Sequence, residues 1–241
     1  IHDMNFWAIP SYYSDNNRTM RNQVISAKKA NHIITISNNS KKDICKYLKV
    51  PEDKISVIYH GINDELYSNV VDYEATNPYI LFVGARNKYK NFEGIVKSFS
   101  RLKKSHPLLQ LFCAGNQPTN HEKKILKLYN VSDSIVFLQA SNEKLISLYK
   151  GAKVFVFPSF YEGFGLPILE AMAANCPVAL SNTGCFPEIA GEAGAYFDPS
   201  NIDHMTSIIN KILCDSSYAS SLRKKGSKRV KDFSWDKCAQ Q

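Results

Sequence analysis

The chain has 241 residues, of which 44% are hydrophobic and 22% are charged, close to the average of globular proteins. These proportions exclude a disordered, collagen-like or coiled-coil chain. The 30 Lys and Arg residues outnumber the 22 Asp and Glu residues, and the net charge of +8 bears on partners and solubility rather than on fold. No apolar run approaches the roughly 18–20 residues of a membrane-spanning helix. The six cysteines form neither a C-x-x-C pair nor a cluster with zinc spacing, which favours a reducing cytoplasm.

The predicted elements alternate short β-branched runs with longer helical stretches. We expect strands at 32–37, 54–59, 79–83, 108–114, 134–138, 154–158 and 177–181, and helices at 39–49, 91–104, 121–129, 142–150, 167–174, 202–214 and 219–231. Ser40 is the expected N-cap of the first helix, and the polar stretch 63–78 has the composition of a linker. This alternation predicts an α/β fold with a doubly wound parallel sheet, and its wholly apolar strands indicate helices on both faces.

Ligands of open parallel sheets bind beyond the carboxyl ends of the strands, so the residues that follow each strand are the candidate site residues. Gly84 follows the strand 79–83 and permits a tight turn. Arg86, Lys88 and Lys90 come next, and such side chains suit phosphate because Arg offers a planar fork and Lys a point charge. A solvated loop in front of a helix remains an equally ordinary interpretation of this cluster.

The stretch 159–172 follows the strand 154–158 and is the most informative part of the sequence. Pro167 suits a helix start, and two glycines let the backbone approach a ligand. The free N–H groups at such a start attract anions. Glu170 is expected in the first turn, where a carboxylate can accept two ribose hydroxyls, and Glu162 lies at the mouth of the loop. Neither glutamate requires a ligand, because a Glu in a first turn is favourable against the helix dipole and Glu162 could be an ordinary surface residue.

A third loop, 182–188, follows the strand 177–181, and Glu188 is expected in the first turn of the next helix. Three loops at one sheet edge thus supply cations, a helix N-terminus and paired carboxylates. Together they predict a pocket for a nucleotide that carries a diphosphate.

At these residues the sequence resembles the retaining glycosyltransferases of family 4, which have the GT-B fold. The segment 154–188 resembles the signature block of that family, with Glu162 and Glu170 at the ends of its Glu-x7-Glu motif. The segment 83–92 resembles its phosphate loop, and residues 1–3, ITISNNSKKDI and VIYHGIN resemble the tail of its N-terminal domain.

The resemblance implies a chain made of two Rossmann-like domains, the first of them incomplete. Residues 1–75 would be the latter part of the N-terminal, acceptor-side domain with its linker, and residues 76–225 the complete nucleotide-sugar-binding domain. Residues 226–241 would form a C-terminal helix that returns toward the N-terminal domain. No signal-peptide pattern follows Ile1. Because residues 1–3 resemble the end of a strand in the middle of the family's N-terminal domain, we expect an earlier portion to be missing. This stretch should then bind nucleotide, while turnover should need the missing portion.

The resemblance also implies roles for individual residues. Arg86 and Lys90 would hold the donor diphosphate, although Arg86 stands one place later than in the commoner loop. Glu170 would bind the ribose, and His2 would reach the donor across the cleft between the domains. Glu162 and the backbone N–H groups of Gly163, Phe164 and Gly165 would contact the transferred sugar. Gly84 and Leu166 would contact the nucleotide. Leu138 and Gln139 would face its base. Members of the family need no metal and no cofactor besides the donor, here GDP- or UDP-linked.

The expected function is transfer of a hexose, with mannose preferred, to a glycan or lipid-linked acceptor with retention of configuration, in polysaccharide biosynthesis. The excess positive charge lies in residues 76–241, which suits a peripheral contact with an anionic membrane. No nucleic-acid-binding motif is present. Two alternatives stay open: another GT-B enzyme, such as a nucleotide-sugar epimerase, and a non-catalytic module that binds nucleotides or polyanions.

Overall fold

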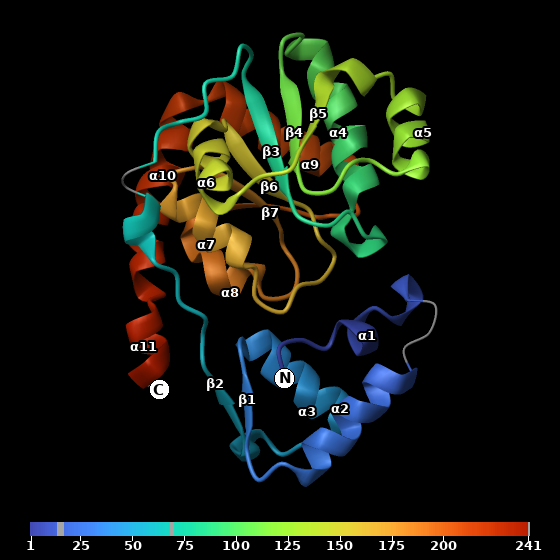
Figure 1. The fold of residues 1–241 in the computed structure, drawn as a ribbon, viewed down its shortest axis with the longest axis vertical. Coiled ribbons are helices and arrows are strands. Elements are labelled where there is room, and N and C mark those ends of the chain that lie inside the picture. Colours follow the sequence, from blue (N-terminus) through green and yellow to red (C-terminus); the bar gives the residue numbers. More distant parts are fainter. Residues whose placement is uncertain (14–16, 68–69, 241) are drawn as a thin grey trace.

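The computed structural model describes residues 1–13, 17–67 and 70–240. Two parallel sheets organise the chain, and Figure 1 shows the small one with its helices below the large one. The small sheet has the order β1-β2, and the large sheet has the order β5-β4-β3-β6-β7-β8. The strands are β1 (Ile33–Thr35), β2 (Ile55–Val57), β3 (Tyr79–Val83), β4 (Gln110–Ala114), β5 (Ile135–Leu138), β6 (Val154–Phe157), β7 (Val178–Ser181) and β8 (Gly194–Phe197).

Helices connect these strands. They are α1 (Asn5–Ala8), α2 (Asn17–Lys29), α3 (Asn38–Leu48), α4 (Phe92–Ser105), α5 (Asn120–Leu128), α6 (Asn142–Gly151), α7 (Leu166–Ala173), α8 (Phe186–Ala190), α9 (Ile202–Cys214), α10 (Ser216–Arg229) and α11 (Trp235–Gln240). We call residues 1–62 the N-terminal lobe and residues 79–229 the C-terminal lobe.

Alternate residues of the large sheet point to opposite faces, and each face has its own core. Leu81 of β3 packs with residues of α6, α7 and α8, whereas its neighbours Ile80 and Phe82 pack with residues of α4, α5 and α9. Burial on both faces explains why the strand sequences are apolar throughout.

The strand order reverses at β3, which pairs with β4 on one side and with β6 on the other. The chain therefore leaves β3 and β6 in opposite directions at their carboxyl ends. This switch point is where doubly wound sheets bind ligands. The loops after β3 and β6 are those that carry Lys90 and Glu162.

The predicted strands and helices between residues 32 and 231 are present, with two corrections in detail. The N-cap of α3 is Ser37 rather than Ser40, because Ser37 is extended and its hydroxyl accepts a hydrogen bond from Ser40 N. Helix α7 begins at Leu166, so Glu170 lies in its second turn rather than its first. The sequence interpretation also missed α1, α2 and β8.

The chain crosses back to the N-terminal lobe after α10. Ile62 N donates to Phe233 O at 3.2 Å, and a Cβ atom on Gly61 would lie 2.2 Å from Trp235 N. Helix α11 lies beside the lower part of the molecule in Figure 1. Helix α10 runs through residue 225, and the domain boundaries near 75 and 225 stay predictions. Within the described ranges, no helix is both long and apolar enough to cross a membrane.

Candidate active site

A buried ion pair joins the loops that leave β3 and β6. Lys90 Nζ lies 2.5 Å from Glu162 Oε1, and the two side chains are only 17% and 14% exposed. The rings of Tyr89 and Phe157 flank the ammonium, with centroids 5.2 and 5.4 Å from Nζ. Aromatic faces attract a cation, so the lysine is held at the switch point by charge on one side and by rings on the other.

The environment of Glu162 favours the protonated carboxyl. Burial raises its pKa above the ordinary value, and the charge of Asp3 acts in the same direction. The charge and hydrogen bond of Lys90 oppose this effect. A carboxylate in such a place is costly unless it keeps a cationic or hydroxyl partner.

Residues of the N-terminal lobe lie directly against this loop. A Cβ atom on Gly163 would lie 2.7 Å from both His2 O and Asp3 Cβ, so only glycine fits there. The His2 ring stacks on that of His60, with centroids 5.7 Å apart. The structure therefore brings His2 and the Glu162 loop to the same interface between the lobes.

The start of α7 leaves several donors without acceptors. Gly165 takes a left-handed conformation at the N-cap position, with φ of 93°, and no side chain caps the helix. In the described parts of the chain, the backbone N–H groups of Gly163, Phe164, Gly165 and Leu166 donate no hydrogen bond to any other group. Free N–H groups at a helix start form a binding site for an anion.

Glu170 is half-buried and is held by one hydroxyl. Tyr149 donates from its hydroxyl to Glu170 Oε2 at 2.9 Å. Burial raises the pKa of Glu170, and the hydrogen bond from Tyr149 lowers it again in part. The other oxygen, Oε1, makes no hydrogen bond to the described residues, so it can accept a ligand hydroxyl.

A cavity of about 400 Å³ opens beyond the ends of β3, β4 and β5. It is lined by Val83, Gly84, Ala114, Gly115, Asn116, Gln139, Ala140 and Leu145. A Cβ atom on Gly115 would lie 2.8 Å from Gly84 O, so the two loops approach closely. Gln139 lines this cavity, and Leu138 ends β5, where its carbonyl accepts from Gly115 N at 2.8 Å.

Two family models together match residues 1–229 of the chain. The model described as glycosyl transferases group 1 matches residues 64–229, and the model described as glycosyltransferase family 4 matches residues 1–66. This chain belongs to the glycosyl transferases group 1.

Named relatives of this glycosyltransferase include bacterial mannosyltransferases. It is 29% identical to the O-antigen chain mannosyltransferase B of Escherichia coli, with all of this chain aligned to 67% of that protein. It is 31% identical to the O-antigen chain mannosyltransferase RfbU of Salmonella typhimurium over 78% of this chain and 52% of that protein. The chain thus spans about half to two thirds of these relatives, and they support glycosyl transfer in glycan biosynthesis.

Solved glycosyltransferase structures share the fold. Sucrose-phosphate synthase from Thermosynechococcus elongatus is 26% identical, with a TM-score of 0.80 over 98% of this chain and 62% of that one. Anabaena HepE, solved in complex with UDP and glucose, is 16% identical, with a TM-score of 0.82 over 99% and 68%. The GT-B fold expected from the sequence is confirmed.

Arg86 of this glycosyltransferase is engaged away from the Lys90–Glu162 pair. Its Nε donates to Glu122 Oε1 at 2.7 Å, and its Nη2 donates to Asn116 O at 2.8 Å. The guanidinium also lies over the ring of Phe137, 4.9 Å from the centroid. The Arg86 side chain is only 4% exposed, which leaves it little freedom to reach a ligand.

The pairing with Arg86 is visible in the pKa of Glu122. Burial alone would raise this pKa, but the hydrogen bonds from Arg86 and from Thr119 hold it below the ordinary value. Arg86 thus forms a structural ion pair between the loop after β3 and helix α5. Among the described residues, the structure does not bring Arg86 together with Lys90.

Sequence reasoning missed several residues around the site. Gly115 and Asn116 follow β4 directly, so the rule that was applied to three other strand ends would have found them. Tyr149 lies on α6, and no local pattern indicates that its hydroxyl reaches Glu170. Ser37 and Cys185 were also overlooked, and both bind the Glu162 loop through its carbonyl groups.

Proposed function

We propose that this protein transfers a hexose from a nucleotide sugar to a glycan or lipid-linked acceptor and retains the anomeric configuration. The observation that carries the proposal is the Lys90–Glu162 pair beside the unpaired N–H groups at the start of α7. A cation and a helix N-terminus in one place suit the diphosphate of a donor, and a carboxylate beside them suits the hydroxyls of its sugar. The family of the chain agrees with this chemistry.

In this proposal each part of the site holds one part of the donor. Lys90 and the N–H groups of Gly163 to Leu166 bind the diphosphate, Glu170 binds the ribose, and the cavity beside Gly84 and Gln139 takes the base. Glu162 accepts hydrogen bonds from the transferred sugar, and His2 reaches that sugar from the N-terminal lobe. Arg86 has no direct part, because Glu122 already occupies its guanidinium.

The chemical step is a substitution at the anomeric carbon. The bond from that carbon to the leaving phosphate oxygen breaks, and a bond to the acceptor oxygen forms on the same face of the sugar. The acceptor's proton passes to the departing phosphate oxygen, so no side chain is needed as a base. Negative charge builds on the diphosphate as it leaves, and the Lys90 ammonium and the dipole of α7 stabilise it where a metal ion would otherwise serve.

We propose mannose as the transferred sugar, because mannosyltransferases are among the relatives. GDP is the favoured carrier, with UDP as the alternative. Titration calorimetry with GDP-mannose, UDP-glucose and ADP-glucose tests both points by measuring the affinity for each donor. Melting temperatures provide a second test, because a donor that binds the native protein raises its melting temperature. If Lys90→Ala and Glu170→Ala bind the preferred donor as tightly as the unaltered protein, the site is assigned wrongly.

We further propose that the protein works in the cytoplasm, in peripheral contact with an anionic membrane. Helix α10 supports this proposal, since it exposes cations such as Lys224 and Lys228 along one helix. Sedimentation with phosphatidylglycerol vesicles, compared with phosphatidylcholine vesicles, tests it. Equal recovery with both lipids would contradict the proposal.

A further inference from the structure

In the loop after β6, side chains hold the carbonyl groups of Phe160, Glu162, Gly163 and Phe164, while the N–H groups of residues 163–166 donate to no other group in the described part of the chain. Thr183 Oγ1 donates to Phe160 O at 3.3 Å, and the Cys185 thiol lies 3.2 Å from Glu162 O and 3.1 Å from Phe164 O. The remaining carbonyl, that of Gly163, accepts from a residue of the other lobe. Because a peptide's N–H and C=O point in opposite directions, fixing these carbonyls on one side aims the neighbouring N–H groups to the other side.

Ser37 supplies this contact from the N-terminal lobe. Its hydroxyl donates to Gly163 O at 2.7 Å and accepts from Ser40 N at 3.0 Å as the N-cap of α3. Ser40 Oγ lies 3.3 Å from His2 O, so the same turn also holds the segment that carries His2. One helix start thus fixes two parts of the site, one from each lobe.

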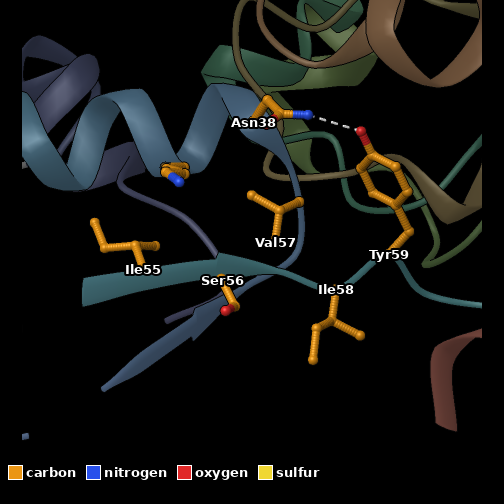
Figure 2. A pocket seen from close by; sticks show the side chains of 7 residues that line it. Asn38, Ile55, Ser56, Val57, Ile58 and Tyr59 are labelled. Carbon is orange, nitrogen blue, oxygen red and sulfur yellow. Dashed lines mark hydrogen bonds between the residues drawn. The ribbon is translucent and has the colours of Figure 1, made fainter. Parts of the chain in front are cut away.

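Glu188 of the C-terminal lobe closes the same helix start. Its carboxylate accepts from Asn38 N at 2.6 Å and from Asn39 N at 3.1 Å, which are donors that α3 itself leaves unsatisfied. Tyr59 donates to the carboxylate at 2.8 Å and accepts from Asn38 Nδ2 at 2.8 Å. Figure 2 shows Asn38 and Tyr59 joined at the end of a cavity of about 500 Å³.

Contacts with helix α10 hold the backbone of Glu188 in place. Arg229 of α10 donates to the backbone oxygens of Glu188 and Ile189 at 2.7 and 2.9 Å. The ring of Phe233 lies under the same guanidinium, 4.8 Å from its centre. These contacts fix the backbone that carries the Glu188 carboxylate, so its hydrogen bonds to α3 resist movement between the lobes.

We propose that Ser37 and Glu188 form a latch between the lobes that positions the groups contacting the donor. The latch keeps the N–H groups of Gly163 to Gly165 turned toward the donor and holds His2 opposite Glu162. Neither Ser37 nor Glu188 touches the donor, so both are positioning residues. This inference rests on the proposed function, because it assigns the latch to the same site.

The test compares Ser37→Ala and Glu188→Ala with Asp215→Ala. Asp215 is the matched control, since its carboxylate also caps a helix start, accepting from Tyr218 N at 2.8 Å, but it precedes α10 and bonds no described residue of the N-terminal lobe. We expect the kcat of the full-length protein to fall about tenfold or more in both latch variants, because Glu188→Ala loses hydrogen bonds to a carboxylate and Ser37→Ala loses the bond to Gly163 O. The Kd of the nucleoside diphosphate should rise by a smaller factor than kcat falls, because Lys90 and Glu170 still bind the nucleotide. Ser37→Thr should restore kcat, since threonine keeps the hydroxyl.

Two results would overturn the latch. One is a kcat in both latch variants equal to that of Asp215→Ala. The other is a loss of nucleotide affinity as large as the loss of kcat, which would indicate general damage to the C-terminal lobe.

Hydrogen exchange separates the latch from the proposed function. We expect faster exchange of the amides of Asn38, Asn39 and Ser40 in Ser37→Ala and Glu188→Ala, because their acceptors belong to the latch, but not in Asp215→Ala. This readout needs no donor. If the unaltered protein binds no nucleotide sugar, the proposed function fails while the exchange data still support or reject the latch.

Discussion

Lys90 Nζ and Glu162 Oε1 lie 2.5 Å apart, although 72 residues separate them in the chain. The adjacency of β3 and β6 in the sheet brings the two loops together. The ammonium is therefore paired before any donor arrives, and an arriving diphosphate competes with the carboxylate for it. A carboxylate displaced in this way becomes free to accept sugar hydroxyls.

The first prediction concerns Lys90→Ala. We expect the affinity for the nucleoside diphosphate to fall about ten- to a hundredfold, because a charge-assisted hydrogen bond contributes about 1.5–3 kcal/mol. Titration calorimetry at constant salt measures the change. Lys97→Ala is the matched control, since Lys97 pairs with Glu93 on the exposed face of α4 at 3.0 Å. A larger loss of affinity in the control would contradict the assignment of Lys90.

The second prediction concerns the pH dependence of nucleotide binding. Glu170 has a raised pKa, so its carboxylate is lost as the pH falls toward the acid range, while still above the ordinary value of 4.5. Tyr149→Phe removes the hydrogen bond that lowers this pKa, and the loss should then begin at higher pH. We expect nucleotide affinity to weaken with falling pH in both proteins, and earlier in the variant.

Calorimetry in a series of buffers from neutral to about pH 5 measures this shift. Tyr196→Phe is the control, because its hydroxyl bonds Gly191 O and lies away from Glu170. An identical pH profile for Tyr149→Phe and the unaltered protein would show that the hydroxyl does not act on the carboxylate.

Much of the fold was readable because its strands are continuous apolar runs. YILFV and VFVF are bounded by polar or proline-containing loops, and burial on both faces requires such sequences. Strand β8 was not predicted, because Gly194 and Ala195 have little strand preference of their own. Only their pairing with β7 makes them a strand. Helix α2 was missed because its sequence, NRTMRNQVISAKK, is mostly polar.

The sequence predicted those site residues that directly follow strands. Lys90 and Glu162 were found in this way, and the resemblance to family 4 gave them roles. The contact of Ser37 with Gly163 spans 126 residues and two lobes, so no local pattern encodes it. Arg86 lies in a cationic loop that predicts a phosphate ligand, whereas its ion pair with the buried Glu122 of α5 depends on tertiary packing that no local pattern encodes.

The third prediction therefore concerns Arg86→Met. We expect the unfolding free energy at pH 7 to fall by about 3 kcal/mol, because the change leaves the buried Glu122 carboxylate without its partner. Glu122 has a lowered pKa in the native protein, so its stabilisation is present above its unfolded pKa and is lost as the pH falls through the folded value. The variant and the unaltered protein should thus approach equal stability in acid.

Urea unfolding at neutral and acid pH measures these differences, and calorimetry measures nucleotide binding. We expect the nucleotide Kd of Arg86→Met to stay within about twofold of the unaltered protein, because no donor bond is removed. A tenfold loss of affinity in a folded variant would restore Arg86 as a ligand of the diphosphate.

The last prediction concerns Gly61, where the chain after α10 crosses the N-terminal lobe. A Cβ atom at this position would lie 2.2 Å from Trp235 N and 2.4 Å from Ser234 C, and backbone atoms cannot move aside as a flexible side chain can. Gly61→Ala should therefore push residues 234–235 away and cost about 1–3 kcal/mol, as overpacking does. For a chain of this size, that lowers the melting temperature by about 2–4 °C for each kcal/mol.

Scanning calorimetry measures the change, and Ser234→Ala provides the comparison. Ser234 loses only its hydrogen bond to Lys237 N at 3.2 Å, so that variant weakens the start of α11 without a collision. We expect a clearly smaller drop in melting temperature for Ser234→Ala than for Gly61→Ala. Equal drops would mean that the fraying of α11, rather than close packing at Gly61, decides how firmly the end of the chain is held against the N-terminal lobe.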